Sequence, residues 1–141
     1  MKVEASVVIE RPVEAVFRFY AHEHVRNHPR WDPEMALEPT SPGPIGVGTV
    51  IRRRNSRAGV PVEGTMTITE FEPERAMSGV IREGGFEIRG GATFEALGPD
   101  RTRLTIGAEM PWLTPGSDST PIARSMERSV RNIKELIEAE T

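Results

Sequence analysis

The sequence predicts an α+β protein in which a curved antiparallel sheet of about seven strands wraps around a long C-terminal helix. Over most of the chain, apolar residues alternate with polar ones at a period of two, as on strands with one buried face. Near the C-terminus the apolar residues return at helical spacing instead. Short turn sequences separate the strands, so consecutive strands are expected to pair antiparallel.

The first strand is expected where four apolar residues alternate with mostly polar ones. These residues are Val3, Ala5, Val7 and Ile9. Pro12 follows, and proline is favoured in the first turn of a helix because its missing N–H would be unpaired there anyway. A short helix is therefore predicted at about residues 12–20. A second short helix at residues 21–28, ended by Pro29, could precede a turn at residues 31–33.

The remaining strands are predicted in the middle of the chain. An irregular or edge segment comes first, and the strands follow at 47–52, 60–69, 75–83, 85–97 and 101–110. Gly84 and Gly85 predict a two-residue hairpin turn, because glycines reach the positive φ angles that such turns need. Gly90 and Gly91 lie inside a strand pattern and predict a bulge or a sharp bend.

A long helix is predicted at residues 119–139, with a length of about 31 Å at about 1.5 Å per residue. Its apolar residues form one stripe, which consists of Ile122, Met126, Val130, Ile133 and Ile137. Such a stripe must be buried, and the inner face of the sheet is the surface available to bury it. A curved sheet around one helix also leaves space that side chains do not have to fill.

Composition excludes several classes of function. The 141 residues are 37% hydrophobic and 28% charged, which suits one folded domain spanning residues 1–141. The net charge of -3 argues against nucleic-acid binding, and the absence of cysteine excludes thiol nucleophiles and thiolate metal sites. No apolar run has the roughly 18 residues of a membrane span, and no signal-peptide pattern is found, so the expected location is the cytoplasm.

Four short segments are similar to those of a known superfamily. Residues 9–17 (IERPVEAVF) resemble its opening strand-to-helix passage, and residues 31–33 (WDP) resemble its tryptophan–proline turn. Residues 46–49 (GVGT) resemble its entry to the third strand, and residues 68–73 (ITEFEP) resemble its strand-ending passage before the next hairpin. In this order the segments identify the chain as similar to the START-related, or SRPBCC, helix-grip superfamily, the polyketide cyclase/dehydrase and lipid-transport group. The resemblance implies this fold and an internal cavity for a hydrophobic ligand.

Ten residues are predicted to surround such a cavity. They are Trp31, Met66, Ile68, Phe86, Phe94, Met110, Trp112, Ile122, Met126 and Val130. Methionine suits this role because its flexible side chain adapts to varied apolar shapes. By periodicity alone an ordinary packed core is favoured over a cavity, and the resemblance reverses this preference.

Three charged residues are candidates for an inward-facing position. Arg53 lies in the basic stretch 51–57 and could clamp a carboxylate, or cover a sheet face in a solvated hairpin. Glu70 and Arg82 lie on strands whose alternation can point them inward, where a buried charge would be paired or functional. The alternative is that a bulge turns each of them outward. No residue is assigned a catalytic role.

His24 and His28 are four residues apart and would share one helix face, which is geometrically suitable for a metal. The alternative is a polar surface helix with incidental histidines. Because a metal site needs three or four ligands, we expect neither a metal nor another cofactor.

The leading functional hypothesis is binding of a lipid, isoprenoid or polyketide-like molecule, for transport or sensing. One alternative is a polyketide cyclase or dehydratase acting on such a molecule. The other is a protein-interaction module without ligand, such as a homodimer. Paired ionisable groups beside a cavity favour the enzyme, a purely apolar lining favours the carrier, and a filled core favours the interaction module.

Overall fold

The computed structural model describes residues 2–39, 41–57 and 60–141. Its elements follow the predicted order, and their bounds are β1 (Lys2–Ile9), α1 (Val13–Phe17), the π-helical turn η1 (Arg18–His22), α2 (His24–Trp31), β2 (Met35–Pro39), β3 (Val50–Arg57), β4 (Val60–Glu72), β5 (Ala76–Glu83), β6 (Phe86–Gly98), β7 (Arg101–Glu109) and α3 (Thr120–Glu140). Within the described residues, no helix is both long enough and apolar enough to cross a membrane.

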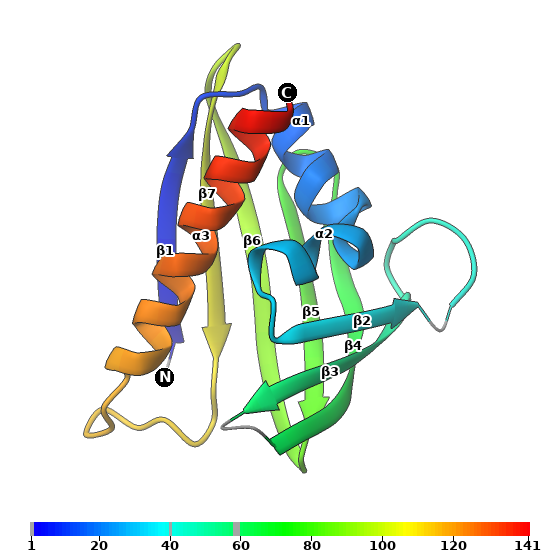
Figure 1. The fold of residues 1–141 in the computed structure, drawn as a ribbon, viewed down its shortest axis with the longest axis vertical. Coiled ribbons are helices and arrows are strands. Elements are labelled where there is room, and N and C mark those ends of the chain that lie inside the picture. The colour runs from blue at the N-terminus through cyan, green and yellow to red at the C-terminus, as the bar shows by residue number, and fades with distance from the viewer. Residues whose placement is uncertain (1, 40, 58–59) are drawn as a thin grey trace.

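The seven strands form one antiparallel sheet in the order β1-β7-β6-β5-β4-β3-β2. Strands β2 to β7 pair with their neighbours in the chain, and β1 joins the sheet beside β7. The sheet bends so far that β2 and β3 run across the direction of β6 and β7, while α3 lies along β1 and β7 (Figure 1). The predicted helix-grip fold is confirmed.

The helical region after β1 differs in detail from the prediction. The first helix continues past residue 17 as the π-helical turn η1, and α2 begins at His24. Pro29 does not end α2 as predicted but lies inside it. A proline removes only its own backbone hydrogen bond, and the helix closes soon afterwards, where the Asp32 N–H donates to the carbonyl of His28.

The glycine pairs of the β5–β6 hairpin have two different roles. Gly84 and Gly85 have φ angles of 55° and 82°, so the predicted two-residue turn is confirmed. Of the bulge or sharp bend predicted at Gly90 and Gly91, the bulge is wrong, because β6 pairs with β5 and β7 there without a shift in register, and the bend stays a prediction. Gly91 instead allows close packing, since a Cβ there would lie 2.5 Å from Ser78 Oγ.

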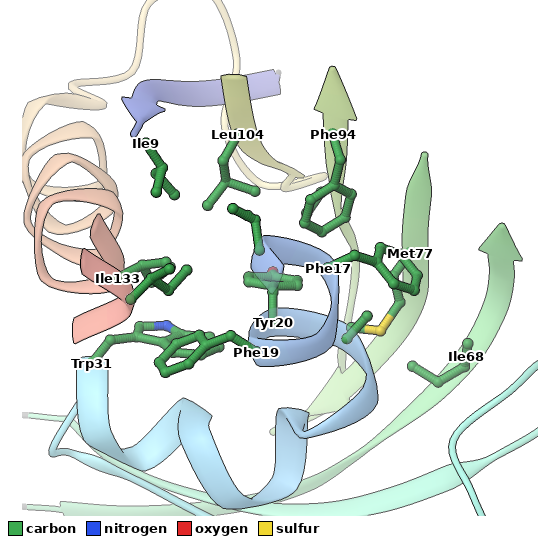
Figure 2. Close-up of a cluster of buried hydrophobic side chains, with 14 of the residues drawn as sticks. Ile9, Phe17, Phe19, Tyr20, Trp31, Ile68, Met77, Phe94, Leu104 and Ile133 are labelled. Carbon is green, nitrogen blue, oxygen red and sulfur yellow. The ribbon is translucent and has the colours of Figure 1, made fainter. Parts of the chain in front are cut away.

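The interior has a large core at one end and a small apolar cluster at the other. In the large core, aromatic side chains of α1 and η1 fill the space between α3 and the sheet, with Phe17 and Tyr20 facing Phe94 (Figure 2). The small cluster consists of Val3, Ile88, Met110 and Leu113. The apolar stripe of α3 serves both ends, because its C-terminal part belongs to the large core and its N-terminal part packs on the small cluster.

Candidate functional site

A cavity of about 640 Å³ is lined by the concave face of the sheet, by α2 and by the N-terminal half of α3. Residues of both apolar clusters contribute to its walls, Met66 and Met77 from the large core and Ile88 and Met110 from the small cluster. The volume is in the range of roughly 300–1,000 Å³ that small-molecule sites occupy. The sheet and α3 therefore border a half-open cavity that is large enough for a ligand.

All five methionines in the described part of the chain line this cavity. They are Met35, Met66, Met77, Met110 and Met126. They come from β2, β4, β5, the loop after β7 and α3, so they surround the space from several directions. Unbranched thioether side chains adapt to ligands of different shape, which gives the cavity compliant apolar walls.

The part of the lining that comes from β5, β6 and β7 consists largely of small residues. Gly79, Gly90, Gly91 and Gly107 lie on these adjacent strands and all border the cavity. The register pairs Gly79 with Gly90 and Gly91 with Gly107, so the glycines are neighbours across the sheet. Gly79 and Gly90 share the face of Met77 and Ile81, so this part of the wall carries no side chain, whereas a Cβ at Gly91 or Gly107 would point to the other face, toward Ser78 or Glu4.

One wall carries a buried ion pair that crosses a strand. Arg53 Nε donates to Glu83 Oε2 at 2.6 Å, and the two side chains are only 8% and 3% exposed. Gly64 on β4 is the register partner of both residues, so the pair passes over it. A Cβ at Gly64 would lie 2.5 Å from Glu83 Cγ, which explains why a glycine is needed there. Arg53 lines the cavity with its charge already compensated.

Of the three charged residues considered for an inward position, only Arg53 is buried. Glu70 is exposed because a register shift in β4 after Ile68 turns it outward, where it accepts a hydrogen bond from Ser78 Oγ at 2.9 Å. Arg82 is also exposed and pairs with Glu87 on β6 at 3.2 Å. The inward orientation considered for these two residues is therefore wrong.

The buried acid that sequence analysis missed is Glu83. Its signal was present in β5, where Met77, Gly79, Ile81 and Glu83 are spaced by two residues and therefore share one face. The first three of these residues line the cavity. Continuing the alternation to the end of the strand would have selected Glu83 in place of Arg82.

The polar surface helix considered for His24 and His28 is also wrong, because both residues line the cavity. His24 Nδ1 lies 2.8 Å from the carbonyl oxygen of Tyr20. Since a carbonyl can only accept, His24 Nδ1 carries the proton and Nε2 keeps a lone pair. His24 Nε2 and His28 Nδ1 are buried with no hydrogen-bond partner among the described residues.

Burial controls the protonation of this wall. Desolvation lowers the pKa of His24 to about 4, with a further contribution from the charge of Arg53 and an opposing one from the Tyr20 carbonyl. The pKa of His28 is also lowered well below its ordinary value, first by desolvation and then by His24 and Arg53. Desolvation raises the pKa of the Tyr20 phenol to about 12. At neutral pH the side chains of Tyr20, His24 and His28 are therefore polar and uncharged.

The ten residues predicted to surround the cavity divide into three groups. Five line it, namely Met66, Met110, Trp112, Ile122 and Met126. Four are buried but do not line it, namely Trp31, Ile68, Phe94 and Val130. Phe86 is 53% exposed and contacts Trp112 from outside the cavity. For these five residues the cavity prediction is wrong, whereas ligand contact by the first five stays a prediction.

Two of these buried residues, Phe94 and Trp31, belong to the large core because they pack against aromatic side chains of α1 and η1. Phe94 meets Phe17 and Tyr20 edge to face, and Trp31 stacks on Tyr20 with ring centroids 5.2 Å apart. Among the described residues no group of three or more potential ligands could hold a metal ion. His24 and His28 therefore give no argument for a metal site.

Comparison with known proteins identifies a family. Residues 1–138 match the family described as polyketide cyclase / dehydrase and lipid transport. The Zhui aromatase/cyclase from Streptomyces sp. R1128 superimposes with a TM-score of 0.77 at 17% identity, covering 98% of this chain and 93% of that one. A START superfamily protein from Mycobacterium smegmatis superimposes with a TM-score of 0.75 at 14% identity, covering 99% of each chain.

DynU16, a protein of the dynemicin biosynthetic locus, superimposes with a TM-score of 0.74 at 20% identity. The match covers 97% of this chain but 47% of DynU16, so the chain spans about half the length of that protein. No curated protein matches the chain in sequence. At these identities the solved structures show a common fold.

Proposed function

Because the chain belongs to the polyketide cyclase/dehydrase and lipid transport family, we propose that it binds a hydrophobic small molecule inside the cavity, for transport or sensing. The ligand would be a lipid, an isoprenoid or a polyketide-like molecule. The observation that carries this proposal is the cavity of about 640 Å³ with five methionines in its walls.

The distribution of polar groups supports a ligand with an apolar body and a small polar part. Apolar residues and glycines, the five methionines among them, line the larger part of the space, whereas the polar lining residues include Tyr20 of η1, His24 and His28 of α2, Asp32 and Glu34 before β2, and Arg53 of β3. Small-molecule sites commonly combine an apolar lining with a few placed polar groups that orient the ligand. The apolar body would lie against the methionines, and the polar part would face the histidines.

A cyclase or dehydratase is the second candidate, because ionisable groups border the cavity. Arg53 and Glu83 form a buried pair, and His24 Nε2 offers a lone pair that could accept a proton. A general base works best when its pKa lies near the working pH, and burial holds the pKa of His24 at about 4. This makes His24 better suited to accepting a hydrogen bond than to removing a proton. The buried Arg53–Glu83 pair is an observation in favour of the enzyme, but its two charges compensate each other, so binding remains the first proposal.

The proposal can be tested with 1,6-diphenyl-1,3,5-hexatriene, a hydrocarbon that fluoresces in apolar surroundings. We expect saturable binding at one site per chain. Binding should be lost in Met126→Trp, because the indole would occupy the cavity that Met126 lines. Glu127→Trp is the matched control, since it adds the same side chain at the next, exposed position of α3. Absence of binding to the wild type, or equal binding to both variants, would contradict the proposal.

A further inference from the structure

We propose that the cavity selects an apolar ligand that carries a hydroxyl group, and that this hydroxyl donates its hydrogen to His24 Nε2 beside His28 Nδ1. The inference rests on the proposed binding function and specifies the chemical class of the ligand. Phenols, enols and alcohols belong to this class.

The first step is the pair of imidazole nitrogens without partners. Buried polar atoms in proteins nearly always have a hydrogen-bond partner, because leaving one unpaired costs free energy. His24 Nε2 and His28 Nδ1 are both buried and unpartnered within the described residues. The two rings lie one helical turn apart with centroids separated by 4.8 Å, and both residues line the cavity. A ligand in the cavity can therefore supply the missing partner.

The second step is that the polarity and position of His24 are set by its neighbours. The Tyr20 carbonyl holds the proton on Nδ1, so Nε2 can only accept a hydrogen bond. The ring lies edge-on to Tyr20 and Trp31, with centroid separations of 5.2 Å and 5.6 Å. His28 stacks on Trp31 at 4.9 Å. This aromatic packing orients both imidazoles before a ligand arrives, which strengthens selection for a donor.

The third step excludes other polar groups on the ligand. A carboxylate, ketone or ether has no hydrogen to donate to His24 Nε2. A carboxylate would also lose its hydration without gaining a free positive charge, because Arg53 is already paired with Glu83 at 2.6 Å. The lowered pKa values keep both imidazoles uncharged at neutral pH. An uncharged hydrogen-bond donor fits these conditions, and a hydroxyl is such a donor.

The test compares 2-naphthol with 2-methylnaphthalene, which differ only by a hydroxyl in place of a methyl group. Both would displace 1,6-diphenyl-1,3,5-hexatriene from the protein at pH 7. We expect 2-naphthol to bind about tenfold more tightly to the wild type, since one hydrogen bond contributes on the order of 1.4 kcal/mol. If no hydrogen bond forms, 2-methylnaphthalene should bind more tightly than 2-naphthol, because its methyl group has no hydration to lose on leaving water.

Variants assign the preference to the histidines. In His24→Asn the shorter amide can still donate to the Tyr20 carbonyl but has no atom at the position of Nε2, so the preference for 2-naphthol should disappear. His28→Phe keeps the ring that stacks on Trp31 and should weaken the preference. His22→Asn is the control, because His22 is exposed and contacts Phe17 and Phe71 outside the cavity lining. That variant should keep the wild-type preference.

The outcomes separate the two proposals. If the wild type binds the hydrocarbon probe but shows no preference for 2-naphthol, the hydroxyl site is wrong and the cavity function stands. A preference that persists in a folded His24→Asn variant would also overturn the assignment to His24. If the probe does not bind the wild type at all, the proposed function fails together with the hydroxyl site. The wild-type comparison does not depend on whether any variant folds.

Discussion

Met126 and Ile133 lie seven residues apart on the same apolar stripe of α3, yet they meet different surroundings. Met126 is partly buried and borders the cavity. Ile133 is completely buried in the large core, where Figure 2 shows it facing the aromatic side chains of α1 and η1. Equal substitutions at the two positions therefore measure how well the interior is filled at each end.

Met126→Trp should change the free energy of unfolding by less than about 1 kcal/mol, because the cavity can accommodate the added rings without overpacking. Ile133→Trp should cost about 3 kcal/mol, since a close-packed core must distort to admit a larger side chain. The measurement is the denaturation midpoint of each variant without ligand. Equal, large losses for both variants would mean that the interior is solid at Met126 as well.

Arg53 and Glu83 form the second residue-scale feature, a charge pair removed from water. Arg53→Met should destabilise the protein by about 3 kcal/mol, because the buried Glu83 carboxylate loses its compensating charge. The double variant Arg53→Met, Glu83→Gln should lose less, since no charge remains to be buried. Urea unfolding of the wild type, both single variants and the double variant measures this coupling. Additive losses in the four proteins would show that the pair does not interact as described.

At the scale of secondary-structure elements, β3, β4 and β5 are arranged around Gly64. The ion pair of the outer two strands crosses the middle strand at this residue, and the backbone of β5 also approaches it closely. A Cβ at Gly64 would lie 2.2 Å from the Arg82 carbonyl oxygen, a distance that requires the strands to move. The glycine thus determines both the spacing of the strands and the position of the ion pair.

Gly64→Ala should therefore cost about 3 kcal/mol, as expected for forced overpacking, and should weaken ligand binding by displacing Arg53. The comparison is with Gly116→Ala in the loop before α3, where an added Cβ would meet nothing within 4 Å. That variant should change stability by no more than about 0.5 kcal/mol. Thermal or urea unfolding measures both effects, and similar stabilities of the two variants would argue against the close approach at Gly64.

The interior of the molecule is close-packed beside the C-terminal half of α3 and contains the cavity beside its N-terminal half. The helical segment after β1 contributes Phe17, Phe19 and Tyr20 to the large core, and the cavity begins where these side chains end. Tyr20, His24 and His28 lie between the two regions, so the same helices that complete the core also supply the polar wall. Folding and ligand binding are therefore linked through the protonation of this wall.

Stability should fall as the pH drops from about 6.5 to about 4. The pKa of His24 is about 4 in the folded protein and about 6.5 when exposed, so between these values only the unfolded chain takes up the proton. Complete protonation of His24 would lower the free energy of unfolding by about 3 kcal/mol. The lowered pKa of His28 acts in the same direction. Asp32, whose pKa is raised by burial, opposes this at the acid end of the range.

Melting temperatures measured from pH 7.5 to pH 4 test this prediction. The groups around the histidines include the Tyr20 phenol, whose pKa is raised to about 12 by burial, so it stays uncharged throughout this range. The double variant His24→Asn, His28→Phe should show a shallower decline than the wild type, because other acid-sensitive groups remain. Parallel curves for the two proteins would mean that the buried histidines do not contribute.

The sequence by itself determined the order of the elements, the antiparallel sheet, the hairpin turn at Gly84 and Gly85, and the apolar stripe of α3. These features depend on residues close together in the chain, through side-chain periodicity and backbone preference. The resemblance of four short segments correctly indicated the family, and the cavity lies where a curved sheet meets one helix. Five of the ten predicted lining residues border that cavity.

Only the tertiary structure decided which inward-facing residues meet the cavity and which meet the core. Phe94 and Met66 both face inward, but Phe94 is covered by Phe17 and Tyr20, from more than 70 residues earlier in the chain. A register shift after Ile68 turned Glu70 outward, and pairing across Gly64 placed Glu83 beside Arg53. Periodicity specifies on which face of a strand a side chain lies, whereas contacts between segments distant in the chain decide whether that side chain borders the core or the cavity.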